Sequence, residues 1–235
     1  ITDLTRLNRL ETVRRDFTTN VSHELRTPVT AIRASLETIR DAGFSDAKAC
    51  ETFLEIALRG TDRLEAILSD LMSLARIEEE EKNGLERTLL DCDTVIDAAI
   101  RDASERIARA GMTVVREGET ALTFVAHEGL VKQAFVNLLD NAAKYAADGK
   151  EIRVITAREG IFAVVTVADR GPGIPERDRS RVFERFYRVN KARSRDSGGT
   201  GLGLSIVRHV ALANSGSVRL ECPPEGGSAF SILLP

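Results

Sequence analysis

Apolar residues recur at steps of three or four along the first forty positions, and this spacing does most to limit the fold. The stripe comprises Leu4, Leu7, Leu10, Val13, Phe17, Val21, Leu25, Val29, Ile32, Leu36 and Ile39. Such steps return to one side of an α-helix, so the pattern predicts a long amphipathic helix. A second stripe follows the break at residues 42–46, where Ser45 or Asp46 can cap a new helix. We therefore expect a helical hairpin.

The second stripe, Phe53, Ala57, Leu64, Ile67, Leu71 and Leu74, is as continuous as the first. Each predicted helix is too long for its apolar stripe to be covered by one neighbouring helix. A second copy of the chain would complete a four-helix bundle and bury both stripes. We therefore expect a homodimer formed through the hairpin.

The pattern changes after the charged run at residues 78–82 and the Asn-Gly pair at 83–84, which favours a turn. Beyond it, short β-rich runs lie at 112–116, 122–126, 152–157, 162–168, 217–221 and 229–234, and helical stretches lie near 93–110, 128–147 and 203–213. This alternation predicts an α/β or α+β layer with helices on one face. We expect two domains, at residues 1–83 and 84–235, and a mobile loop at 188–199.

Composition excludes several classes of partner. The net charge is -3, and Lys and Arg are spread along the chain, so no basic patch indicates binding to nucleic acid or an anionic membrane. No run reaches the roughly 18–20 apolar residues that span a bilayer, and the start lacks the features of a signal peptide. We expect a cytoplasmic fragment of a longer protein, in which only upstream segments contact a membrane.

His23 is a candidate nucleophile. It lies roughly 200° from Val21 on a helical wheel, so its imidazole is expected to face solvent. Imidazole attacks phosphorus through an unprotonated nitrogen, and the neighbouring Glu24 can accept the N–H of the other nitrogen. Pro28 removes an amide that would bond to the Glu24 carbonyl, which predicts a kink there. The alternative, a surface histidine without chemistry, is not excluded by spacing alone.

The predicted helix near 128–147 has a polar face that could hold a nucleotide. It carries Asn137, Asn141, Lys144 and Tyr145, opposite the apolar Phe135, Leu139, Ala142 and Ala146. Side-chain amide oxygens suit Mg²⁺, and a lysine offers a point charge to phosphates. A merely solvated helix face is the alternative, although two interior asparagines are costly in a purely structural helix.

Two glycine-rich segments complete the candidate site. Asp169 ends an apolar run and begins Asp-Arg-Gly-Pro-Gly-Ile, where glycines allow close approach to a ligand and the carboxylate can accept an amino proton. Residues 198–204, Gly-Gly-Thr-Gly-Leu-Gly-Leu, lead into a helical run whose N-terminus favours phosphate. A capped turn is the alternative for the first segment. A dinucleotide fold or a Walker loop is disfavoured for the second by its context.

Residues 22–28, Ser-His-Glu-Leu-Arg-Thr-Pro, resemble the H-box of bacterial sensor histidine kinases at all seven positions. Residues 137–145, 169–174, 182–188 and 198–204 resemble, in this order, the N, G1, F and G2 boxes of the same family. The resemblance covers nearly the entire chain, with departures at Val29 and at residues 214–215 that do not touch the proposed chemistry. The first seven residues also resemble the end of a PAS sensor module, as in a PhoR-like subgroup.

The resemblance implies a helical hairpin that dimerises into a four-helix bundle, followed by an α/β sandwich of the Bergerat (GHKL) type shared with ATPases of the gyrase and Hsp90 group. It implies a kinase that phosphorylates His23 from Mg-ATP and passes the phosphoryl group to an aspartate in the receiver domain of a response regulator. Glu24 would be the acid/base partner. Thr27 would position water when the kinase dephosphorylates that regulator.

The resemblance also assigns roles in the nucleotide site. Asn141 would coordinate Mg²⁺ with help from Asn137, Asp169 would bind adenine, and Lys144, Tyr145 and Arg188 would approach the phosphates. Gly171, Gly173 and Ile174 would also bind the nucleotide, and the pocket would be closed by Gly199, Thr200, Gly201, Leu202 and Gly203. Phe183 and Phe186 would anchor a lid. Related ATPases have a water-activating glutamate at the position of Asn137, and its absence favours transfer over hydrolysis. A GHKL-type ATPase and a nucleotide-sensing scaffold without phosphotransfer remain the alternatives.

Overall fold

The computed structural model describes residues 2–146, 149–189, 199–224 and 226–235, with side chains described from Thr18 onward. The chain forms two compact units: residues 1–71 with 198–200, and residues 72–197 with 201–235. The last turns of the second hairpin helix thus group with the second unit, and the boundary at residues 83–84 stays a prediction. The predicted mobile loop at 188–199 lies mostly outside the described residues.

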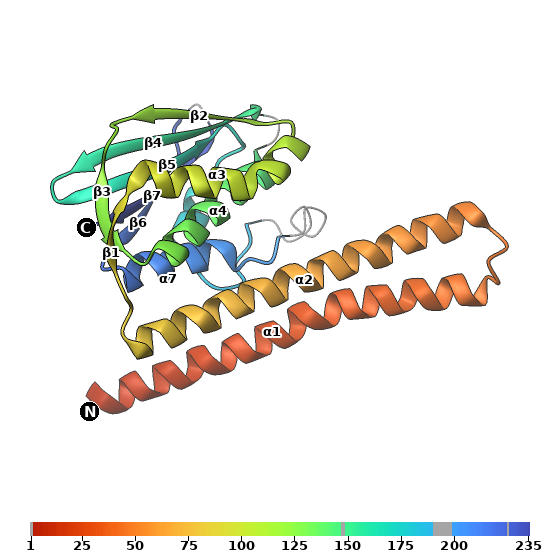
Figure 1. Cartoon of the computed structure of the whole chain (residues 1–235). Coiled ribbons are helices and arrows are strands. Elements are labelled where there is room, and N and C mark those ends of the chain that lie inside the picture. The colour runs from red at the N-terminus through yellow and green to blue at the C-terminus, as the bar shows by residue number, and fades with distance from the viewer. Residues whose placement is uncertain (1, 147–148, 190–198, 225) are drawn as a thin grey trace. The chain divides into compact units, whose positions relative to one another are not determined.

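The hairpin consists of α1 (Thr2–Asp41) and α2 (Ala47–Asn83), as the two apolar stripes predict (Figure 1). Asp46 caps α2, because its Oδ1 accepts a hydrogen bond from the Ala49 amide at 3.0 Å. The helix ends before Gly84, whose φ of +85° suits a glycine. The kink predicted at Pro28 does not interrupt α1, which stays helical on both sides of the proline.

The two hairpin helices approach each other closely at Gly60. A Cβ atom built there would lie 2.6 Å from Cγ1 of Ile32 and 3.5 Å from the Pro28 carbonyl oxygen. A side chain at this position would therefore push the helices apart. Pro28, Ser35 and Ile39 are buried along the same face of α1. This contact fixes which residues of α1 and α2 face each other.

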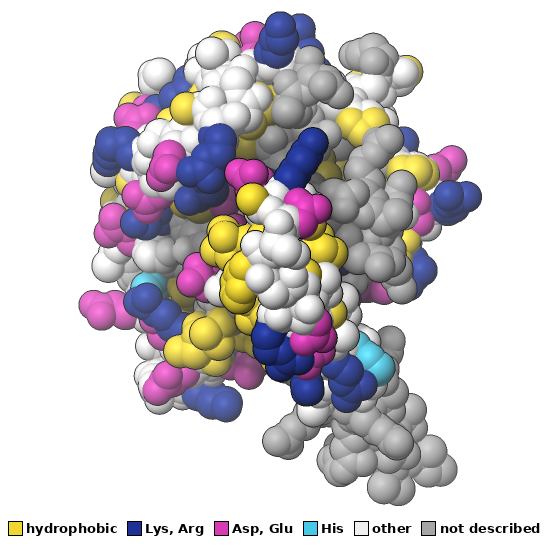
Figure 2. Space-filling model, turned by 90° about the vertical axis from the view of Figure 1, so that its right-hand side faces the viewer, with side chains coloured by type: hydrophobic (Ala, Val, Ile, Leu, Met, Phe, Trp, Pro, Cys, Tyr) yellow, Lys and Arg dark blue, Asp and Glu magenta, His cyan; other side chains and the backbone are white. Residues whose placement is uncertain are grey.

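Much of the apolar surface of the hairpin stays uncovered in a single chain. The side chains that are at least half exposed include Val29, Leu36, Leu54, Leu58 and Leu68. Figure 2 shows hydrophobic side chains lying open on the surface beside charged ones. No helix within the described part of the chain is both long and apolar enough to cross a bilayer.

The second unit is built on a five-stranded mixed sheet. Its strands are β2 (Thr113–Gly118), β4 (Glu151–Glu159), β5 (Phe162–Asp169), β7 (Ser228–Leu234) and β6 (Ser217–Glu221), in this spatial order. Only β2 and β4 pair in parallel. The helices α3 (Cys92–Arg109), α4 (Glu128–Tyr145) and α7 (Gly203–Ala213) lie on one face of the sheet (Figure 1). The predicted sandwich of helices on a sheet is therefore confirmed.

The described part of the second unit also contains three short elements. Strands β1 (Thr88–Asp91) and β3 (Thr123–Ala126) form a separate antiparallel pair. A single helical turn, α5 (Glu176–Arg179), follows the loop after β5. The core between helices and sheet includes the fully buried Phe135 of α4, Ile152 of β4 and Ile232 of β7.

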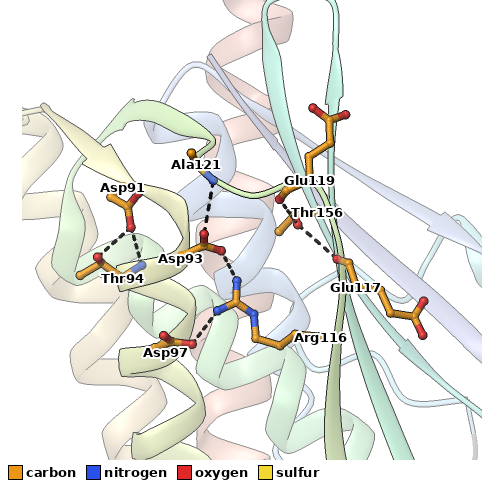
Figure 3. Close-up of polar contacts among 9 residues, drawn as sticks. All are labelled: Asp91, Asp93, Thr94, Asp97, Arg116, Glu117, Glu119, Ala121 and Thr156. Carbon is orange, nitrogen blue, oxygen red and sulfur yellow. Dashed lines mark hydrogen bonds and ion pairs between the residues drawn. The ribbon is translucent and has the colours of Figure 1, made fainter.

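The N-terminal turn of α3 is attached to strand β2 by a polar network (Figure 3). Asp91 caps the helix, since its Oδ1 accepts bonds from the Thr94 amide at 2.8 Å and hydroxyl at 2.7 Å. Both bonds lower the pKa of Asp91, and the bond from the hydroxyl has the larger effect. Arg116 on β2 pairs with Asp93 and, at 2.6 Å, with Asp97 of α3. The two ion pairs of Arg116 hold the start of α3 against β2.

Candidate functional site

His23 is exposed on α1, so the prediction that its imidazole faces solvent is confirmed. Thr27, one turn later, is exposed on the same side, and its hydroxyl donates to the His23 carbonyl oxygen at 3.2 Å. The histidine is thus open to a phosphoryl donor from outside the hairpin.

Glu24 turns toward α2. Its Oε2 accepts a hydrogen bond from Nη2 of Arg63 at 2.6 Å. The role of Glu24 as partner of the imidazole stays a prediction. Sequence reasoning missed Arg63, because it lies 39 residues from Glu24 and no local pattern distinguishes it from other charged residues of α2.

Helix α4 has the predicted polar and apolar faces. Phe135, Leu139, Ala142 and Ala146 are buried, whereas Asn137 and Asn141 are half-buried and Lys144 and Tyr145 are exposed. The Asn137 amide is held at both ends: Oδ1 accepts from Nε2 of Gln133 at 3.1 Å, and Nδ2 lies 3.5 Å from the Gly203 carbonyl oxygen. Asn137 therefore joins α4 to the first turn of α7. The i,i+4 spacing of Gln133 could have revealed this partner from sequence.

The carboxylate of Asp169 lies at the end of β5 in a half-buried position. Its Oδ1 accepts a hydrogen bond from the Gly171 amide at 2.8 Å. Burial raises the pKa of Asp169, and hydrogen bonds from the backbone of Gly171 and Ser228 oppose this effect. A carboxylate fixed in this way is a well-oriented acceptor for an amino group of a ligand.

The loop after β5 needs its glycines for close packing. A Cβ on Gly171 would lie 2.9 Å from that of Ala146, at the end of α4, and a Cβ on Gly173 would lie 2.9 Å from the Gly227 carbonyl oxygen. Gly227, with a φ of +88°, donates its amide to the Gly171 carbonyl at 2.8 Å. Ile174, which is half-buried, accepts a bond from the Arg179 side chain. Sequence reasoning missed Gly227, although a Gly-Gly pair between two predicted strands signals a tight turn.

The segment at residues 182–188 is fixed at two points. The ring of Phe183 packs edge-on against Phe230 of β7, with 6.1 Å between centroids. The amide of Phe186 donates to the Gly201 carbonyl oxygen at 2.8 Å. Arg188, at the end of the segment, is half-buried. The function of both phenylalanines as anchors of a lid stays a prediction, since residues 190–198 lie outside the described ones.

The glycine segment is divided between the two units. Gly199 and Thr200 are buried and group with the first unit, whereas Gly201, Leu202 and Gly203 belong to the second. Leu202 is fully buried at the N-terminus of α7. Gly201 has a φ of +78°, and a Cβ there would lie 2.9 Å from the Phe186 backbone. The glycine is therefore required by its contact with residues 182–188.

Two histidines outside this site have structural contacts. His127 caps α4, because its Nδ1 accepts from the Leu130 amide at 3.4 Å, and its Nε2 lies 2.9 Å from Glu80. The Nε2 atom of His209 lies 3.1 Å from Glu81. Both contacts lie within the second unit.

The polar face of α4 fits a magnesium ion better than it fits a transition metal. No group of three or more His, Cys, Asp or Glu side chains in the described ranges could hold a metal ion. Mg²⁺ needs no such group, because it keeps several waters and shares phosphate oxygens with its ligand. The half-buried amides of Asn137 and Asn141, one turn apart, are donors of the kind that Mg²⁺ accepts.

Two protein families match the chain. Residues 13–80 match the "His Kinase A (phospho-acceptor) domain". Residues 126–235 match the "Histidine kinase-, DNA gyrase B-, and HSP90-like ATPase" family. The first match contains His23, and the second contains every residue assigned above to nucleotide binding.

Similar curated proteins are sensor kinases. The sensor-like histidine kinase SenX3 of Mycolicibacterium smegmatis is 37% identical over 97% of this chain and 59% of its own length. The phosphate regulon sensor protein PhoR of Pseudomonas aeruginosa is 34% identical over 98% of this chain and 52% of its own. The chain thus spans about half the length of these relatives.

Similar solved structures are also histidine kinases. The Acinetobacter baumannii histidine kinase AdeS has a TM-score of 0.69 at 24% identity, over 90% of this chain and 96% of that one. The mycobacterial sensor histidine kinase MprB has a TM-score of 0.56 at 30% identity, over 64% of this chain and 97% of that one.

Proposed function

The chain belongs to the sensor histidine kinases and holds their two-component catalytic core, and from this membership we propose that it phosphorylates its own His23 from Mg-ATP. The observation that carries the proposal is the exposed imidazole of His23 within a phospho-acceptor domain that the same chain joins to an ATP-binding domain.

Phosphoryl transfer needs one unprotonated imidazole nitrogen. Its lone pair forms the N–P bond while the bond between the γ-phosphorus and the bridging oxygen breaks, and ADP leaves with that electron pair. Glu24 would accept a hydrogen bond from the other ring N–H and stabilise the positive charge that develops. The chain supplies mainly positioning and charge, which are the usual sources of catalysis in this reaction.

The second unit would hold the nucleotide. Asp169 would accept a hydrogen bond from the exocyclic amino group of adenine. The fixed orientation and partial burial of its carboxylate support this role. Asn141 and Asn137 would hold Mg²⁺, which brings positive charge to the phosphate oxygens. Lys144, Tyr145 and Arg188 would approach the phosphates, and the glycines at 171, 173, 201 and 203 would let the backbone close around them.

We further propose a homodimer and a response regulator as partners. The exposed leucines of the hairpin support a second copy, because a four-helix bundle would bury them. The phosphoryl group would pass from His23 to an aspartate of the receiver domain. Since the relatives are about twice as long, sensor segments and a membrane anchor belong to the proposal for the whole protein, with this part in the cytoplasm.

Incubation with γ-labelled ATP and Mg²⁺ tests the proposed function. Wild type should acquire acid-labile, base-stable label on the protein, and His23→Gln should acquire none. Release of labelled phosphate without labelled protein would favour the GHKL-type ATPase. Nucleotide binding without either product would favour the nucleotide-sensing scaffold.

The reverse activity depends on Thr27 in this proposal. Thr27→Ala should leave labelling of His23 within about twofold and slow dephosphorylation of the regulator by about 10-fold or more, as expected when a group that positions water is lost. Thr30→Ala is the matched control, because the Thr30 hydroxyl makes the same bond one turn back, to the Arg26 carbonyl at 2.9 Å. Equal loss of both activities in Thr27→Ala would refute this role.

A further inference from the structure

Arg63 of α2 holds the carboxylate that neighbours the proposed phosphoacceptor. The bond from its Nη2 to Oε2 of Glu24 is 2.6 Å long, slightly shorter than the roughly 2.7–2.9 Å of charge-assisted N–H···O hydrogen bonds. The side chain of Arg63 is only 10% exposed and that of Glu24 is 27% exposed. Arg63 is therefore shielded from water much more than the arginines of the other described ion pairs of the hairpin, such as Arg59, whose side chain is 61% exposed.

The helix packing turns Glu24 toward Arg63 and away from His23. Glu24 lies one turn before the buried Pro28, on the face of α1 that contacts α2. Gly60, three residues before Arg63, meets Pro28 and Ile32 in the close contact between the helices. His23 is one residue and about 100° from Glu24, on the exposed side.

Release of Glu24 would leave Arg63 in an unfavourable state. The Nε atom of Arg63 is buried and already has no hydrogen-bond partner among the described residues. If Glu24 turned away, the guanidinium would also lose the acceptor at Nη2 while remaining largely out of water. Removing one partner of such a pair costs more than the pair itself contributes, because a buried charge is left alone. The packing thus favours Glu24 bound to Arg63.

We propose that Arg63 is a positioning residue that controls how often Glu24 is available to His23. The short bond holds the Glu24 carboxylate on the side of α1 that faces α2, so the carboxylate turns to accept the imidazole N–H only when this bond lengthens or breaks. Arg63 therefore slows phosphorylation of His23 in this arrangement of the hairpin. A shift of α1 against α2 that lengthens the bond would raise the rate. This inference rests on the proposed function, since it concerns the same reaction.

The test compares Arg63→Gln in two backgrounds of the full chain, with γ-labelled ATP as the probe. In wild type, the change should raise the initial rate of His23 labelling at saturating ATP by about 3- to 10-fold, as expected for release of a carboxylate from a populated competing state. The KM for ATP should not change. In a Glu24→Gln background, Arg63→Gln should have no effect, because no carboxylate remains to be released.

Two controls separate this role from general destabilisation. Arg59→Gln, one turn away on α2, breaks an exposed pair and should leave the rate unchanged. Arg63→Lys keeps the charge without the planar fork and should raise the rate less than Arg63→Gln. If Arg63→Gln does not fold, Arg63→Lys carries the test in the same two backgrounds.

The outcomes distinguish the inference from the proposed function. Labelled wild type with no gain in the folded Arg63 variants, or an equal gain in the Glu24→Gln background, overturns the role of Arg63. A wild type that acquires no acid-labile label at all overturns the proposed function instead.

Discussion

The two compact units differ in how completely they bury their apolar side chains. In the hairpin, Leu54, Leu58 and Leu68 are 50–60% exposed. In the second unit, Phe135 and Ile232 are at most 2% exposed. The second unit therefore carries a core of its own, whereas the hairpin depends on a partner surface to bury its apolar stripe.

The two units also differ in what positions their functional residues. His23 and Thr27 are placed by the periodicity of one helix, and their positions follow from local sequence. Asp169 is placed by contacts between segments that are distant in sequence, such as that of Gly171 with Gly227. Changes in the hairpin should thus act on assembly, and changes in the second unit should act on folding and on nucleotide binding.

The largest expected effect is on assembly. Leu54→Glu combined with Leu58→Glu would place two charges on the exposed apolar surface of α2. We expect the dimer to dissociate, with a dimer Kd raised by more than about 100-fold, because two central apolar contacts each contribute a factor of about 10 or more. Sedimentation equilibrium measures this change. Ile161→Glu, at a 75% exposed site of the second unit, is the control and should leave the dimer intact.

The next effect is on the folding of the second unit. Phe135→Ala removes a fully buried ring between α4 and the sheet, and we expect the free energy of unfolding to fall by about 3–5 kcal/mol. Urea unfolding followed by circular dichroism measures it. Leu212→Ala, at a 59% exposed position of α7, should change this free energy by less than about 0.5 kcal/mol. A similar loss in both variants would contradict the assignment of the core.

A substitution of Asp169 should have a smaller effect, and its effects on ATP binding and on stability should have opposite signs. Asp169→Asn should weaken ATP binding by about 10-fold or more, since a hydrogen bond to a charged acceptor is lost. Isothermal titration calorimetry measures the affinity. The nucleotide-free protein should nevertheless become more stable at neutral pH, because burial raises the pKa of this carboxyl and its ionisation opposes folding.

The pH dependence gives the sign of the stability change. A raised pKa means that the stabilising contribution of Asp169 is present below the unfolded pKa of about 3.9 and is lost as pH rises through the folded pKa. The gain in Tm from Asp169→Asn should therefore be largest at neutral pH and vanish near pH 4. Asp102→Asn should have the opposite sign, because a bond from Lys132 lowers the pKa of Asp102. A variant of Asp169 that loses stability at pH 7 would contradict this account.

Local periodicity predicted most of the fold. The apolar steps gave the bounds of α1 and α2 closely, and the six β-rich runs located all five strands of the main sheet and also β3. The four-residue β1 was not predicted, because its pattern is mostly exposed and too short for alternation to be recognised. The single turn of α5 was missed because it is also only four residues long.

Side chains whose placement depends on distant segments could not be predicted. Arg63 becomes significant only when the hairpin register, set by Gly60, brings it opposite Glu24. Gly227 becomes significant only when β7 pairs with β5 and carries it against Gly171. Periodicity predicts which face of an element a residue occupies, but not which residue of another element meets it.

The smallest expected effect lies in the cap of α3. Asp91→Ala removes the acceptor of the Thr94 amide and hydroxyl, and we expect the Tm to fall by about 2 °C at pH 7. These bonds lower the pKa of Asp91, so its ionic contribution is present above the unfolded pKa of about 3.9 and is lost as pH falls through the folded pKa. Thermal melts should thus show the difference from wild type shrinking below pH 4. Thr94→Val keeps the amide donor and should lower the Tm by less than Asp91→Ala does. If Asp91→Ala lowers the Tm equally at all pH values, the charge of Asp91 does not contribute.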